Sequence, residues 1–233
     1  MAANGIELTV TGRAVYTDAN GDQGIPGVKV SVCEDDGIAG RQCVTTITAG
    51  DGDFTVHFVD VFELDSSLEI YVEIRADSPG ASVHSYLSPL PYCYRSKTVF
   101  IDGATHYSFG HMAPLDNLSC GSLIAPLTDS RDNAGFYIFK QLNHAFEYMN
   151  SITIHANSAV VPKVTARLIA ASDNTDTPTS SYSSSDTTIK VQPYTWDVDS
   201  ERGFQTIFHE YGHHLLHSFA ESPAPDYDNG NCD

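Results

Sequence analysis

Short runs in which apolar and polar residues alternate fill the first half of the chain, from residue 6 to about residue 112. The runs are rich in β-branched residues and are separated by Gly, Asp, Asn and Pro, which is the two-residue period of strands. About seven such strands, with no helical period between them, indicate an antiparallel β-sandwich. The clearest runs are residues 7–16, 28–32, 54–58 and 68–74.

The pattern changes near residue 119. Apolar residues recur at steps of three and four over 132–150, which predicts an amphipathic helix, and strand-like runs follow at 163–169 and 188–191. We expect the Ser- and Thr-rich stretch 177–188 to be a loop. The chain is therefore predicted to have two domains, a β-sandwich over 1–118 and an α+β unit over 119–233.

A second helix-periodic segment, residues 204–217, contains the motif His-Glu-x-x-His. On a helix His209 and His213 are one turn apart on the same face, so their imidazoles can bind one cation. Glu210 is about 100° further round the helix and can hold a water that the metal polarises. The spacing thus predicts a Zn²⁺ site with His209 and His213 as ligands and Glu210 as the catalytic base. We expect Gly212 to leave room for a neighbouring element.

A catalytic zinc site needs a third protein ligand. Asp226 and Asp228 are the candidates after the helix, and Glu221 follows too closely to be a good one. The remaining histidines of the segment, His214 and His217, are expected to be exposed or hydrogen-bonded locally and not to bind metal.

The motif and its surroundings resemble the active-site helix of gluzincin metallopeptidases of the thermolysin and fungalysin type. The order of helix, strands and metal-binding helix over about 119–220 is similar to the N-terminal lobe of that group. The resemblance implies zinc ligands at His209 and His213, a general base at Glu210 and a substrate-binding edge on the strand of Ile189. The group's C-terminal lobe, with its glutamate ligand, is expected to be missing from these 233 residues.

Three segments of the first half, residues 12–18, 24–30 and 49–54, resemble transthyretin-like or carboxypeptidase-regulatory-like modules of secreted proteins. Such modules are usually spacers or adhesive units beside an enzyme. This resemblance implies a β-sandwich and no particular chemistry.

The five cysteines favour an extracellular or cell-surface location. Cys33 and Cys43 flank a turn-rich segment and are predicted to pair, Cys93 and Cys120 form a plausible second pair, and Cys232 is left over. Asn117 begins a glycosylation sequon, Asn-Leu-Ser. No signal peptide is visible after Met1, so we expect that it has been removed.

The acidic composition argues against a nucleic-acid partner. Thirty Asp and Glu against 12 Lys and Arg give a formal charge of −18, and no basic cluster occurs. No apolar run approaches the length of a membrane span. Asp18, Asn20 and Asp22 alternate as in a calcium loop, but a hairpin turn is the better interpretation, with weak Ca²⁺ binding as the alternative.

Two functions are consistent with these observations. The first is a secreted zinc endopeptidase acting on polypeptide substrates through metal-activated water, with its site incomplete in this chain. The second is a non-catalytic extracellular structural or adhesive module, able to self-assemble with neighbouring subunits, that retains a degenerate zincin lobe.

Overall fold

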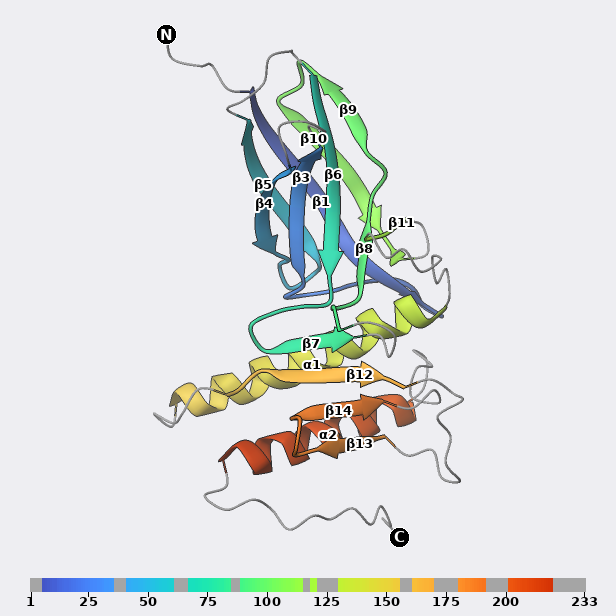
Figure 1. The fold of residues 1–233 in the computed structure, drawn as a ribbon, viewed down its shortest axis with the longest axis vertical. Coiled ribbons are helices and arrows are strands. Elements are labelled where there is room, and N and C mark those ends of the chain that lie inside the picture. The colour runs from blue at the N-terminus through green and yellow to red at the C-terminus, as the bar shows by residue number, and fades with distance from the viewer. Residues whose placement is uncertain are drawn as a thin grey trace. The chain divides into compact units, whose positions relative to one another are not determined.

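Two compact units make up the protein, one of residues 1–75 and 93–133 and the other of residues 76–92 and 134–233 (Figure 1). The sequence predicted one boundary near residue 118, whereas residues 76–92 group with the second unit. The computed structural model describes residues 6–35, 41–60, 67–84, 89–114, 118–120, 130–155, 161–169, 180–191 and 201–219.

The first unit contains a four-stranded sheet centred on the long first strand. Strand β1 (Ile6–Asp18) lies between β10 (His106–Met112) and β2 (Gly21–Gly24), and β5 (Asp53–Asp60) also pairs with it. The β2 and β5 pairings are antiparallel, but β1 and β10 run parallel, with a register shift between Thr11 and Arg13. The prediction of a wholly antiparallel sandwich was therefore wrong for this pair.

The second sheet of this unit has six strands, all paired antiparallel. Its order is β11-β8-β6-β3-β4, and β9 pairs with another part of β6. The strands are β3 (Lys29–Asp35), β4 (Arg41–Ile47), β6 (Ser67–Arg75), β8 (Cys93–Arg95), β9 (Val99–Asp102) and β11 (Leu118–Ser119).

The alternation seen in the sequence places the core of this unit on one face of each sheet. In β5 every second side chain is buried, and the intervening ones are exposed. Tyr94 of β8 is also fully buried, and its hydroxyl donates a hydrogen bond of 2.7 Å to the Met112 carbonyl of β10, which links the two sheets. The core residues include Leu8, Val10, Val30, Val32, Val56, Phe58, Ile70, Val72 and Ile74.

The second unit contains a four-stranded mixed sheet and two helices (Figure 1). The sheet order is β13 (Ser181–Ser183), β14 (Thr188–Val191), β12 (Val164–Leu168) and β7 (Ala81–His84). Strands β7, β12 and β14 run parallel, and β13 is antiparallel to β14. The expected helices are present as α1 (Ser130–His155) and α2 (Glu201–Phe219), and α2 packs against β13 and β14.

Close contacts attach residues 76–92 to α1. Gly80 lies against the ring of Phe146, since a Cβ built at Gly80 would come within 2.1 Å of that ring, and Gly135 lies against Tyr92 in the same way. The buried Ser78 hydroxyl donates a 2.8 Å hydrogen bond to the side-chain carbonyl of Asn143 on α1. These contacts and the parallel pairing of β7 with β12 explain why the segment belongs to this unit.

Candidate functional site

The two histidines of the motif converge on α2 as the spacing predicts. Their Nε2 atoms lie 3.1 Å apart, and the ring centroids 4.8 Å apart. Two nitrogen ligands of a tetrahedral zinc, each about 2.0–2.1 Å from the metal, are about 3.3 Å apart. His209 and His213 therefore fit two ligand positions of one zinc ion. Burial and then the neighbouring His209 lower the pKa of His213, which favours the neutral imidazole that binds metals.

Glu210 lies between His209 and His213 in sequence, and it is more buried than either histidine. It is only 7% exposed. Burial raises the pKa of its carboxyl group, while a hydrogen bond from the Tyr182 backbone and the nearby His209 act in the opposite direction. A carboxylate with a raised pKa is suited to accept and return a proton.

Tyr182 of β13 is the site residue that the sequence analysis missed. Its hydroxyl lies 3.0 Å from Nδ1 of His217, and its ring contacts His214 at a centroid distance of 5.6 Å. The backbone of the same residue binds Glu210, so β13 is joined to α2 along two turns. The only sequence signal was an aromatic residue in a Ser-rich stretch that we expected to be a loop.

His214 differs from the expectation of an exposed or locally bonded histidine. It is 1% exposed, and its Nε2 lies 3.2 Å from the Pro162 carbonyl, 52 residues away. Neither its Nδ1 nor the hydroxyl of Tyr211 has a hydrogen-bond partner within the described part of the chain. Burial raises the pKa of Tyr211 to about 12. The described residues also place no atom within 4 Å of a Cβ built at Gly212, so the close approach expected there is not seen.

The strand of Ile189, for which a substrate-binding edge was expected, is not at the edge of its sheet. The strand of Ile189, β14, lies inside the sheet between β13 and β12. Within the described ranges, β13 is the edge strand next to α2. Edge strands present unpaired backbone groups to which an extended chain can add.

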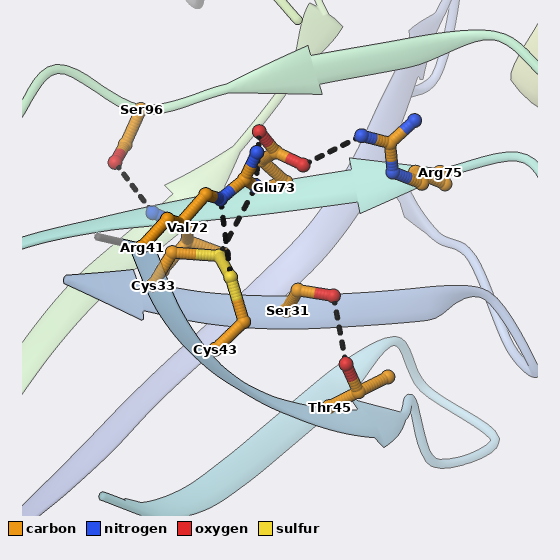
Figure 2. The surroundings of a disulfide bond; sticks show 9 residues. All are labelled: Ser31, Cys33, Arg41, Cys43, Thr45, Val72, Glu73, Arg75 and Ser96. Carbon is orange, nitrogen blue, oxygen red and sulfur yellow. Dashed lines mark hydrogen bonds and ion pairs between the residues drawn. A yellow bond between two sulfur atoms is a disulfide. The ribbon is translucent and has the colours of Figure 1, made fainter. Parts of the chain in front are cut away.

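Both predicted disulfides are present. Cys33–Cys43 joins β3 to β4 (Figure 2), and Cys93–Cys120 joins β8 to the residue after β11. Disulfides persist in oxidising compartments, which is consistent with the expected extracellular location.

Some predicted site residues lie outside the described part of the chain. They are Asn117, Asp226, Asp228 and Cys232. The hairpin turn expected at Asp18, Asn20 and Asp22 is confirmed, because β1 and β2 form an antiparallel pair in which Asp18 lies opposite Gly21.

Within the described ranges, one group brings together three side chains of kinds that can bind a metal: Glu73, Cys93 and Cys120. Because these cysteines form a disulfide, they offer no thiolate ligands. This group is therefore not a metal site in the oxidised protein. Neither helix that the structure describes is long and apolar enough to cross a membrane.

Comparison with known proteins adds little to this geometry. No family model and no curated protein matches the chain. A 9R-lipoxygenase from Cyanothece PCC8801 matches over 65% of this chain and 24% of its own, with 13% identity and a TM-score of 0.29. The major plantain pollen allergen Pla l 1 matches over 51% of this chain and 98% of its own, with 8% identity and a TM-score of 0.31. Likenesses this low carry no argument about fold or function.

Proposed function

We propose that the protein is a secreted zinc-dependent metallopeptidase whose second unit is a zincin-like lobe. The observation that carries the proposal is the 3.1 Å separation of the His209 and His213 Nε2 atoms, with the buried Glu210 beside them on α2. A chance occurrence of the motif in an ordinary amphipathic helix would not require a buried carboxylate next to the paired imidazoles.

Each of these residues has a distinct role in the proposed reaction. His209 and His213 would hold the zinc, and Asp226 or Asp228 is the proposed third ligand. Zinc held there would supply a Lewis acid able to polarise the scissile carbonyl and to lower the pKa of water. Glu210 takes the proton of the attacking water and passes it to the leaving amine. Its burial keeps competing water away, and the Tyr182 backbone holds its carboxylate in place.

The substrate of such a site is an extended polypeptide. Strand β13 adjoins α2, and the backbone of its central residue, Tyr182, bonds Glu210, so a substrate chain lying alongside β13 would pass close to Glu210. The first unit, with its two sheets and two disulfides, would act as an accessory extracellular module beside the catalytic unit.

The proposal is tested by zinc content and proteolysis with the whole chain. Elemental mass spectrometry should find about one zinc per chain, lost in His213→Ala and kept in Glu210→Gln. Cleavage of an unfolded protein should disappear in both variants. His144→Ala is the matched control, because it removes an exposed histidine from the other helix of the same unit. Cleavage that persists in Glu210→Gln would contradict the proposal. A chain without zinc or activity would favour the structural module.

A further inference from the structure

The two disulfides lie on either side of β6 in the six-stranded sheet but differ in their surroundings. Cys33 and Cys43 occupy directly paired positions of β3 and β4, and β3 is the neighbour of β6 on one side. Cys93 belongs to β8, the neighbour of β6 on the other side. Both bonds can therefore be compared within one sheet.

A guanidinium group contacts both sulfurs of the first disulfide (Figure 2). Arg41 Nε donates to Cys43 Sγ at 3.1 Å, and an Nη of the same side chain donates to Cys33 Sγ at 3.2 Å. The guanidinium is held in place by Glu73 at 2.6 Å and lies over the ring of Tyr71, 5.3 Å from its centroid. The positive charge is thus fixed against the sulfurs.

The second disulfide lies near the Glu73 carboxylate, which is itself paired with Arg41 and Arg75. Glu73 has a carboxylate oxygen within 4.8 Å of the sulfurs of Cys93 and Cys120. Among the described residues no guanidinium or ammonium group hydrogen-bonds these sulfurs, and Cys93 Sγ is 3.9 Å from the Tyr94 carbonyl. A cation in contact with a thiol lowers its pKa and favours the thiolate, and among the described residues only the first disulfide has such a contact.

Solvent exposure also differs within the first disulfide. Cys43 is exposed on β4, an edge strand of the sheet within the described residues, and Cys33 is fully buried. A reagent from solvent can therefore reach Cys43, while the sulfur that departs is the buried Cys33 beside Arg41. Departure is faster when the leaving thiol has a lower pKa.

We propose that Cys33–Cys43 is a thiol-exchange site at which low-molecular-weight thiols act on Cys43, with Arg41 stabilising the Cys33 thiolate that leaves. The attacking thiolate forms an S–S bond to Cys43 Sγ as the Cys33–Cys43 bond breaks and its electron pair leaves with Cys33. A second thiol group then attacks the reagent sulfur of the mixed disulfide and releases Cys43. The reagent is oxidised to its disulfide, and its two protons end on Cys33 and Cys43.

The experiment is partial reduction of the oxidised whole chain. Any free thiol, such as that of Cys232, is first blocked with iodoacetamide. Limiting dithiothreitol is then added, new thiols are trapped with N-ethylmaleimide, and peptides are mapped by mass spectrometry against time. Cys33 and Cys43 should be labelled about tenfold faster than Cys93 and Cys120, and Arg41→Gln should slow them by about 3- to 10-fold.

Arg75→Gln is the matched control, because Arg75 pairs with the same Glu73 carboxylate, at 2.7 Å, as Arg41 does. It should leave the rate at Cys43 nearly unchanged. Faster labelling of Cys93 and Cys120 in the wild-type chain would overturn the proposal, and this order is measured even if Arg41→Gln does not fold. Equal slowing by both arginine variants would also overturn it, since the effect would then come from the ion-pair network and not from the contact with sulfur.

Discussion

The hydroxyl of Tyr94 donates a 2.7 Å hydrogen bond to the carbonyl of Met112, and both residues are almost completely buried. The bond connects the six-stranded sheet to the four-stranded sheet of the first unit. Burial raises the pKa of Tyr94 well above its ordinary value, so the hydroxyl remains a donor under all ordinary conditions. This hydrogen bond therefore helps to hold the two sheets against each other.

Tyr94→Phe should destabilise the protein by about 1–2 kcal/mol, because the ring still packs but the Met112 carbonyl loses its partner. Urea unfolding of the two proteins measures the difference. Tyr148→Phe, which changes an exposed tyrosine that is 61% accessible, should have almost no effect. Equal stability of Tyr94→Phe and the wild type would mean that water replaces the hydroxyl.

Gly80→Ala should destabilise the protein by about 1–3 kcal/mol. The added methyl would come within 2.1 Å of the Phe146 ring, so either α1 or the segment before β7 must shift. The free energy of unfolding measures this cost. An unchanged stability would show that the segment moves without loss.

Gly212→Ala should have the opposite effect and stabilise the protein by about 0.5–1 kcal/mol. Gly212 lies in the interior of α2, and a Cβ there meets nothing within 4 Å among the described residues. Alanine loses less backbone entropy on entering a helix. Thermal unfolding measures the gain, and destabilisation would reveal a neighbour at this face of the helix.

Glu73 should contribute stability that is lost in acid. Burial raises the pKa of its carboxyl, but the hydrogen bonds and charges of Arg41 and Arg75 outweigh burial, and the net pKa lies below its ordinary value of 4.5. A carboxylate with a lowered folded-state pKa stabilises the protein above the unfolded pKa, and this stabilisation disappears as the pH falls. The stability difference between wild type and Glu73→Gln should therefore be largest near neutral pH and shrink below about pH 4.5. Glu69→Gln, an exposed position of the same strand, serves as the control, and a difference independent of pH would contradict this interpretation.

Tyr182 offers a test of how β13 is joined to α2. Tyr182→Phe removes the bond to His217 and should cost about 0.5–1.5 kcal/mol, whereas zinc content should be unchanged because the hydroxyl contacts neither His209 nor His213. Tyr182→Ala should cost more, since the ring that contacts His214 is also lost. Chemical denaturation and elemental analysis provide the two measurements. Loss of zinc in Tyr182→Phe would show that the hydroxyl supports the ligands.

The parts of the protein that the sequence determined by itself are those that depend on neighbours along the chain. Helical spacing alone brings His209 and His213 together, and alternation alone identifies most strands of the sandwich. The pairing of Cys33 with Cys43 follows from a short hairpin. These features could be predicted because periodicity and short loops act locally.

The tertiary structure decided everything that depends on distant partners. Residues 76–92 belong to the second unit because β7 pairs with β12, about 80 residues later in the chain. Gly80, which has no side chain, also leaves room for the Phe146 ring. Strand β13 is short and polar, and its partners are β14, with which it pairs, and α2, which it contacts. The burial of Glu210 and the position of Tyr182 follow from that packing. Local propensity does not encode them, because contacts between residues far apart in sequence determine which polar groups are removed from water.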